Sequence, residues 1–240
     1  MNFCGSVERH FYGPFLGLQI WSVASAKTVA GNGGFGYFSA VCWIFGREVY
    51  DALDASTTSP VPIGLVNNNW GGTPVESWTT PETLAACNVT TRDSTLYNSM
   101  IHPYTVGPMA LTGFTWYQGE ANVDERAGDE GAARYSCTFP GMIQQWRSAF
   151  QQPSAYFGFV QLSTWCGNGE LIAEMRTLGQ MAALRLPKVG YSTNADHGAG
   201  CNIHPPPKQY VLFGFPHACL VPFQYMLGTF PMLFLASLVC

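Results

Sequence analysis

The sequence predicts a single α/β domain in which helices cover both faces of a parallel sheet. Short apolar runs that end in polar or glycine-rich loops alternate with longer segments whose apolar residues recur every three or four positions. Repeated strand–loop–helix units of this kind assemble into parallel sheets, with ligand-binding loops at the carboxyl ends of the strands. The chain has 240 residues, 47% of them hydrophobic, which suits one domain with a sizeable core.

The elements follow in order along the chain. We expect a helix over residues 38–53, where apolar residues recur at helical spacing. The continuous apolar run 62–66 ends in Asn-Asn-Asn-Trp-Gly-Gly and predicts a buried strand that opens into a loop. The same pattern predicts strands at 111–116 and 157–162. Further helices are expected over 136–150 and 172–186.

Charge and cysteine spacing exclude two classes of function. Only 11% of residues are charged and the net charge is -4, so we expect no basic face and no nucleic-acid partner. The eight cysteines lie far apart, without a Cys-x-x-Cys pair or a zinc-ligand spacing. We therefore expect neither a metal site nor a cofactor.

The compartment stays open at this point. The single glycosylation sequon, Asn88-Val89-Thr90, together with the cysteine count, favours an oxidising secretory compartment. The alternative is that the cysteines are buried free thiols and the sequon is fortuitous. The first ten residues lack the basic start and apolar run of a signal peptide, which predicts either a cytosolic protein or a longer N-terminus.

Two motifs indicate a hydrolytic site. Residues 116–122, Trp-Tyr-Gln-Gly-Glu-Ala-Asn, place a glycine, a carboxylate and two amides directly after a predicted strand. Residues 203–205, Ile-His-Pro, place a histidine in a loop far downstream. A general base together with hydrogen-bond donors is what ester hydrolysis requires.

Several segments in consistent order resemble the sialate O-acetylesterase family. They are residues 38–47, 63–65, 70–78, 116–122, 135–140, 157–163 and 203–205, followed by Lys208-Gln209. The resemblance covers about residues 18–209. It implies an SGNH hydrolase fold, which is a flavodoxin-like three-layer α/β/α sandwich, here incomplete. It also implies removal of O-acetyl groups from sialic acids, in lysosomes or outside the cell.

Site roles follow from the chemistry, with the family as a guide. His204 is the candidate general base, because Pro205 keeps its backbone extended in a loop of small and polar residues. Gly72 is a candidate oxyanion donor through its backbone, although it would equally suit a tight turn. Gln118 or Asn122 is expected to supply a side-chain amide to the same oxyanion.

Four further residues complete the expected site. Glu120 either orients a catalytic side chain or contacts a sugar hydroxyl; alternatively it stabilises the start of a helical turn through the helix dipole. Trp70 and Trp116, at predicted strand ends, are expected to line a sugar-binding cleft together with Tyr117.

Two departures from the family pattern predict impaired chemistry. An orienting Asp often lies three residues before the His, but Cys201 occupies that position, so Asp196 is the candidate acid. The family's Gly-Gln-Ser-Asn nucleophile motif is missing. Gly5-Ser6 is the only similar pair, and we expect no strand before it. Because a lost serine nucleophile costs on the order of a million-fold in turnover, the chain itself is expected to hydrolyse little.

The end of the chain differs from the rest. Residues 210–240 contain no Asp, Glu, Lys or Arg. This apolar tail is interpreted as an aberrant terminus, a membrane span or a buried helix. The predicted division is therefore an unassigned segment 1–17, a partial esterase domain 18–209 and a tail 210–240. An acetylated sugar is the expected partner; the alternative functions are a non-catalytic sugar-binding remnant and a membrane-tethered fragment.

Overall fold

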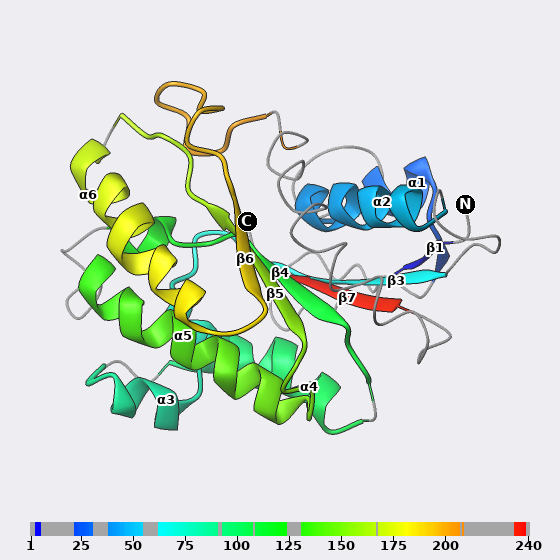
Figure 1. Ribbon diagram of the computed structural model, residues 1–240, viewed down its shortest axis with the longest axis horizontal. Helices are drawn as coiled ribbons and strands as arrows, with labels where there is room; N and C mark the ends of the chain where they lie inside the picture. Colours follow the sequence, from blue (N-terminus) through cyan, green and yellow to red (C-terminus); the bar gives the residue numbers. More distant parts are fainter. Residues whose placement is uncertain are drawn as a thin grey trace.

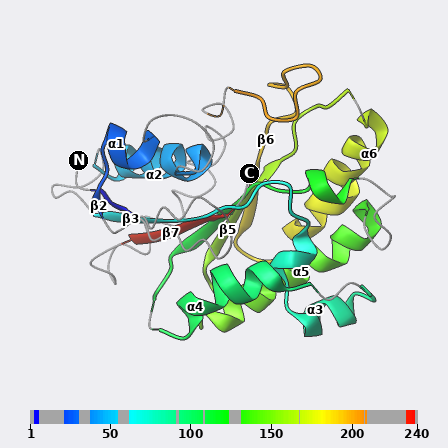
Figure 2. The ribbon, with the colours of Figure 1, turned by 180° about the vertical axis from the view of Figure 1, so that it is seen from behind.

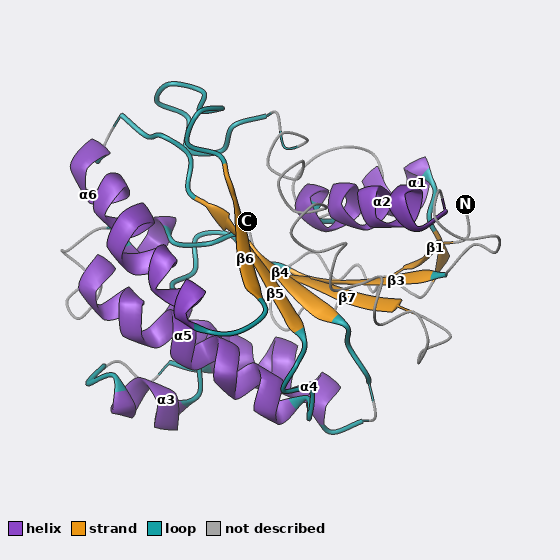
Figure 3. Ribbon diagram, in the orientation of Figure 1, coloured by secondary structure: helices purple, strands orange, loops and turns teal. Residues whose placement is uncertain are grey.

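A parallel sheet with helices on both faces forms the centre of the molecule (Figures 1 and 3). The computed structural model describes residues 3–5, 22–30, 38–54, 62–90, 93–107, 109–123, 131–166, 168–206, 208 and 233–238. Within these residues seven strands form one sheet in the order β2-β1-β3-β7-β4-β5-β6. All neighbours are parallel except β2, which runs antiparallel to β1. The predicted three-layer α/β/α arrangement is confirmed.

The strands are short and mostly buried where their burial is described. The sheet contains β1 (Phe3–Gly5), β2 (Ser22–Val23), β3 (Ile63–Asn68), β4 (Gly113–Trp116), β5 (Tyr156–Gln161), β6 (Val189–Thr193) and β7 (Leu233–Leu238). Every residue of β3 and β4 is buried. Continuous apolar strands of this kind are typical of parallel sheets covered on both faces.

Helices form the two outer layers (Figure 2). On one face lie α1 (Ala26–Ala30) and α2 (Ala40–Asp54). On the other lie α3 (Pro81–Ala86), α4 (His102–Thr105), α5 (Ala132–Ala149) and α6 (Gly169–Glu174). Short 3-10 segments occur at η1 (Val75–Trp78), η3 (Glu120–Asn122) and η6 (Gln180–Arg185), and π-helical turns at η2 (Tyr97–Ile101) and η5 (Met175–Gly179).

An aromatic cluster joins α5 to the sheet. Trp116 of β4 lies edge-on to Trp146 of α5, with ring centroids 5.6 Å apart, and stacks on Phe139 at 6.1 Å. Phe157 of β5 contacts Phe139 at 5.8 Å. Each such pair contributes about 0.5–1.5 kcal/mol beyond the burial of its area, so α5 is held firmly beneath β4 and β5.

The predicted elements agree with the structure except near their ends. The helix over 38–53 is α2, and the strands at 62–66, 111–116 and 157–162 are β3, β4 and β5. The helix over 136–150 begins four residues earlier, at Ala132. The helix over 172–186 is divided into α6, η5 and η6. The sequence did not predict β6, because its residues Val-Gly-Tyr-Ser-Thr form no continuous apolar run.

The apolar tail contributes a strand. β7 lies between β3 and β4 and runs parallel to both. The expectation of a buried helix is therefore wrong for residues 233–238, and a strand in this central position explains the lack of charge there. The other residues of 210–240 lie outside those described. Among the described helices, none has the length and apolar character that a bilayer crossing needs.

Candidate functional site

The carboxyl ends of the parallel strands meet at one edge of the sheet. There β3 ends at Asn68, β4 at Trp116, β5 at Gln161 and β6 at Thr193, as their registers require. In open α/β sheets this edge is where ligands bind. The loops that begin there contain the residues that the sequence predicted for the site.

Two asparagines fix the end of β3. The Asn67 Oδ1 atom accepts a 3.1 Å hydrogen bond from the backbone N–H of Ser39, just before α2. The Asn68 Oδ1 atom accepts one of 3.3 Å from the Tyr104 hydroxyl, which belongs to α4. Both asparagines are almost fully buried. The end of β3 is thus hydrogen-bonded to a helical segment on each face of the sheet.

The loop after β3 presents backbone to solvent. Gly72 is exposed, has a φ of +73°, and leaves open space where a side chain would begin. A non-glycine residue is strained in this conformation, so Gly72 keeps its backbone accessible, as an oxyanion donor would need. Trp70 is half-buried and packs against the core. The structure thus leaves part of Trp70 available at the edge.

A buried hydrogen-bond network joins the β3 and β4 loops. The Gln118 Nε2 atom donates to the Thr73 carbonyl at 3.1 Å and to Asn122 Oδ1 at 2.7 Å. The Asn122 Oδ1 atom also accepts from the Val75 N–H at 2.9 Å, and Asn122 Nδ2 donates to Glu76 Oε2 at 2.8 Å. Gln118, Asn122 and Glu76 are each at most 2% exposed. These amides therefore position the two loops.

The same hydrogen-bond network continues from Gln118 to Trp116 of β4 and Tyr135 of α5. The Tyr135 hydroxyl of α5 donates to Gln118 Oε1 at 3.1 Å and accepts from Trp116 Nε1 at 3.1 Å. Gln180 Nε2 donates to the Gln118 carbonyl at 3.2 Å. Burial raises the pKa of Tyr135 well above its usual range, so its hydroxyl stays protonated.

Four predicted contacts with substrate are corrected by this geometry. Trp116 is fully buried in the aromatic cluster and Tyr117 is 1% exposed, so their predicted place in a sugar cleft is wrong. Both Nε2 hydrogens of Gln118 are engaged inside the protein, and Asn122 is just as occluded. Neither amide faces a ligand as an oxyanion donor would. The prediction failed because an amide in a loop motif looks the same whether it binds substrate or the chain itself.

Glu120 is half-buried at the start of η3. Loss of hydration raises the pKa of its carboxyl to about 7, opposed in part by its own backbone N–H and by the charge of Lys208. A carboxyl group that titrates near neutral pH suits proton transfer or hydrogen bonding to a sugar hydroxyl. It also lies in the first turn of a short helix, as the alternative interpretation required.

His204 lies exposed in the loop that follows β6. Its backbone N–H donates to Asn202 Oδ1 at 2.9 Å, and Pro205 after it is buried. The predicted acid partner is not paired with it. Asp196 instead contacts the Nδ1 atom of His197 at 2.9 Å, and this hydrogen bond lowers the pKa of the exposed Asp196 carboxyl. Adjacent residues pair here because the turn brings their side chains together.

Contacts with the neighbouring loops hold the His204 loop at the edge. A disulfide joins Cys201 to Cys166 of the loop after β5. Asn194 Nδ2 donates to the Tyr117 hydroxyl at 3.1 Å, and Lys208 Nζ lies 4.4 Å from the centre of the Tyr117 ring. A Cβ atom on Gly198 would overlap the Thr164 hydroxyl, so this segment packs closely on the β5 loop. The loops after β4, β5 and β6 therefore converge.

The sequence missed Glu76, Tyr135 and Lys208. A carboxylate between Val75 and Ser77, in a loop expected after a strand, was the available signal for Glu76. Lys208 follows three prolines and was noted only as part of the family resemblance. Among the described residues, no group of three or more His, Cys, Asp or Glu side chains could hold a metal ion.

The segment before Ser6, the serine that most resembles the nucleophile motif, belongs to the sheet. Phe3–Gly5 does form a strand, β1, beside and parallel to β3, so the expectation that no strand precedes Gly5-Ser6 is wrong. Ser6 lies outside the described residues.

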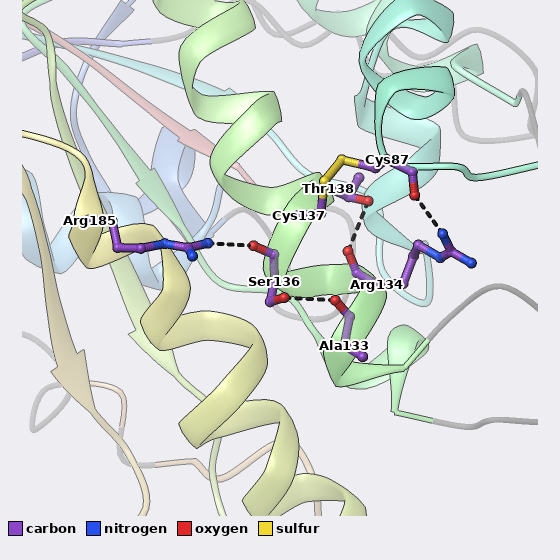
Figure 4. Close-up of a disulfide and its surroundings, with 7 residues drawn as sticks. All are labelled: Cys87, Ala133, Arg134, Ser136, Cys137, Thr138 and Arg185. Carbon is purple, nitrogen blue, oxygen red and sulfur yellow. Dashed lines mark hydrogen bonds between the residues drawn. A yellow bond between two sulfur atoms is a disulfide. The ribbon is translucent and has the colours of Figure 1, made fainter.

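Asn88 is exposed with a φ of 55°, directly after Cys87, which forms a disulfide with Cys137 of α5 (Figure 4). A hollow of about 800 Å³ lies beside this disulfide, lined by α3, α5 and η6 rather than by the edge loops.

Comparison with known proteins agrees with this architecture. A family profile described as carbohydrate esterase, sialic acid-specific acetylesterase, matches residues 38–214. Human sialate O-acetylesterase is 39% identical over 164 residues, covering 60% of this chain and 29% of that protein. The mouse protein of the same name is 36% identical over 191 residues, covering 60% and 33%. The chain thus spans about a third of the length of these relatives.

Two solved structures are similar to the chain. A carbohydrate acetylesterase from Xanthomonas citri superimposes with a TM-score of 0.69 and 32% identity, over 91% of this chain and 49% of that one. A protein from Arabidopsis thaliana superimposes with a TM-score of 0.54 and 21% identity, over 88% and 78%. The second likeness concerns the fold alone.

Proposed function

The chain belongs to the carbohydrate esterase family of sialic acid-specific acetylesterases, and we propose that its edge loops form part of a carbohydrate O-acetylesterase site. The proposed substrate is an O-acetylated sialic acid or another acetylated sugar. The observation that carries the proposal is the convergence of the His204 loop with the Glu120 loop, through Lys208 and Tyr117, at the ligand-binding edge of the sheet.

The proposed chemistry is hydrolysis by a serine enzyme. A serine hydroxyl attacks the acetyl carbonyl carbon while His204 takes its proton, which gives a tetrahedral oxyanion. The exposed backbone of Gly72 is suited to stabilise that negative charge. Collapse breaks the bond to the sugar oxygen, which receives the proton from His204. Water then attacks the acetyl-serine, with His204 again taking a proton; the bond to the serine oxygen breaks, that oxygen receives the proton from His204, and acetate leaves.

We propose further that this chain carries out little of this chemistry by itself. Its sequence contains no Gly-Gln-Ser-Asn motif. In a serine hydrolase, loss of the nucleophile costs on the order of a million-fold in turnover. Binding of the substrate does not require the nucleophile, so affinity for an acetylated sugar is expected to remain.

A fluorophosphonate probe tests the missing nucleophile directly, because it labels only activated serines. We expect no labelling of the folded chain, and acetate release from 9-O-acetyl-N-acetylneuraminic acid at the uncatalysed rate. Labelling that disappears in a Ser6→Ala variant would show that the chain supplies its own nucleophile. Labelling and acetate release that both survive His204→Ala would remove the base assignment.

A non-catalytic sugar-binding role is the second candidate. The half-buried Trp70 near the exposed Gly72 favours it, because a partly exposed aromatic side chain offers apolar surface to a sugar ring. Both candidates predict binding of acetylated sugars, and acetate release distinguishes them. A variant Trp70→Ala is expected to weaken binding at least tenfold in either case, measured by calorimetry.

We also propose that the protein resides in lysosomes or outside the cell. Two disulfides, Cys87–Cys137 and Cys166–Cys201, support an oxidising compartment. The exposure of Asn88 supports use of its sequon.

A further inference from the structure

We propose that Lys208 is a positioning residue for His204, acting through the ring of Tyr117. This inference rests on the proposed role of His204 as the general base. It concerns how the protein holds an exposed imidazole that makes no side-chain hydrogen bond within the described residues. A base must keep a fixed orientation if it is to take a proton from a nucleophile.

Lys208 has an unusual environment for a lysine. Its Nζ atom is inaccessible to solvent and has no hydrogen-bond partner among the described residues. An ammonium group has three hydrogen-bond donors and is costly to bury without acceptors. The Tyr117 ring face, 4.4 Å away, and the nearby Glu120 charge are the favourable interactions that it has in exchange. A lysine that serves only solubility would extend into water.

Tyr117 is a rigid anchor for this contact. The residue is 1% exposed and directly follows β4. Its hydroxyl accepts a hydrogen bond from the buried Asn194 at the end of β6. The ring therefore belongs to the framework of the sheet, and an ammonium group held on its face is fixed relative to the edge.

Only three residues separate Lys208 from His204 in the sequence. The intervening residues are prolines, whose rings fix φ near −65°. Pro205 is buried, and the Lys208 N–H donates to the Pro206 carbonyl at 2.8 Å. Movement of an anchored Lys208 would therefore carry His204 with it. On its other side, His204 follows the Cys166–Cys201 disulfide by three residues. His204 therefore lies between two anchored positions in the chain, Cys201 and Lys208.

Substitution of Lys208 by Met tests this role, because Met keeps the length and loses the charge. We expect hydrogen exchange of the amides of residues 202–206 to rise at least tenfold, with the amides of β4 and β5 unchanged. The His204 imidazole resonances should shift toward those of a free histidine. Lys208→Arg should restore both properties, since a guanidinium also stacks on a tyrosine ring. Lys27→Met, on the exposed surface of α1, is the matched control.

Two outcomes overturn the proposal. One is unchanged exchange and unchanged His204 resonances in Lys208→Met; the other is global unfolding of that variant, which would assign Lys208 to overall stability. Tyr117→Phe provides an independent check, since it keeps the ring and loses the bond to Asn194. His204 should not move there, and movement would attribute its position to Asn194. These measurements use no substrate, so failure of the chain to bind acetylated sugars leaves their result intact and counts only against the proposed function.

Discussion

Two acidic side chains at the site illustrate how the fold controls individual residues. Glu76 accepts a hydrogen bond from Asn122 and is buried, whereas Glu120 is half-buried and lacks full hydration. The sequence singled out Glu120 but not Glu76, because only Glu120 lies among glycine and amide residues. Whether a carboxylate is solvated depends on which loops cover it, and the covering loops come from distant parts of the chain.

The raised pKa of Glu120 predicts stability that depends on pH. Below pH 4.5 the carboxyl is protonated in both the folded and unfolded states and costs nothing. As pH rises from 4.5 toward 7 the unfolded state ionises first, so the folded state loses stability. Glu120→Gln removes this loss. The variant should therefore be more stable than the natural chain at pH 8, and this difference in the free energy of unfolding should exceed the difference at pH 4.5 by on the order of 1–3 kcal/mol.

Urea unfolding at both pH values measures this difference. The exposed Glu174 at the end of α6 provides the matched control, Glu174→Gln. An equal effect of Glu120→Gln at pH 4.5 and pH 8 would contradict the prediction.

The buried network predicts a large cost for losing Asn122. Asn122→Ala removes at once the hydrogen bonds that Asn122 makes with Glu76, with the Val75 N–H and with Gln118. Buried groups that lose their hydrogen bonds cost about 1–3 kcal/mol each, so we expect a loss of about 3–5 kcal/mol by urea unfolding. The exposed Asn98→Ala should change stability by less than about 0.5 kcal/mol. A loss below about 1 kcal/mol in Asn122→Ala would show that water replaces the network.

Helix α5 shows how a local defect is compensated by a distant element. Pro140 lies inside the helix and has no N–H for the Ser136 carbonyl. The Arg185 guanidinium of η6 donates to that carbonyl at 3.1 Å (Figure 4). The sequence predicted this helix from its periodicity, and nothing in the local sequence indicated that η6 would supply the missing donor.

A double-mutant cycle tests the compensation. Arg185→Met in the natural chain should cost about 1 kcal/mol, the net value of a hydrogen bond at a partly exposed site. In a Pro140→Ala background the helix supplies its own N–H, so the same change should cost much less. The expected coupling between the two sites is therefore about 0.5–1 kcal/mol by thermal or urea unfolding. Equal costs in the two backgrounds would contradict the account.

At the scale of the whole molecule, the sequence predicted the layers but not the order of the strands. Continuous apolar runs identified β3, β4 and β5, since a strand buried on both faces needs apolar residues throughout. β6 was missed because it is partly exposed. The place of β7 between β3 and β4 depends on pairing across more than a hundred residues, which periodicity does not encode.

The sequence predicted the positions of the site loops but not the packing of their side chains. Motifs placed His204 and Glu120 in loops at the carboxyl edge, and parallel topology brought these loops together. The pairing of Asp196 with His197, and the burial of Gln118 and Trp116, depend on side-chain packing between loops. Such packing is set by the folded neighbours and leaves no mark in the local pattern.

Exposure of Asn88 predicts glycosylation of the whole protein in a secretory compartment. Expressed through that route, the chain should lose the mass of one glycan on treatment with an N-glycosidase. Thr90→Ala should abolish the shift and Thr90→Ser should keep it, because only the latter preserves the sequon. An unchanged mass in the natural chain would contradict the proposed localisation.

The proposed function requires an acetylated sugar to bind at the carboxyl edge, between the loops of His204 and Glu120. Titration of the folded chain with 9-O-acetyl-N-acetylneuraminic acid, followed by NMR, tests this binding. We expect shifts of the His204 imidazole and Glu120 amide resonances, with saturable binding and no acetate released above the uncatalysed rate. Saturable binding that leaves both residues unchanged, or no binding at all, would contradict it.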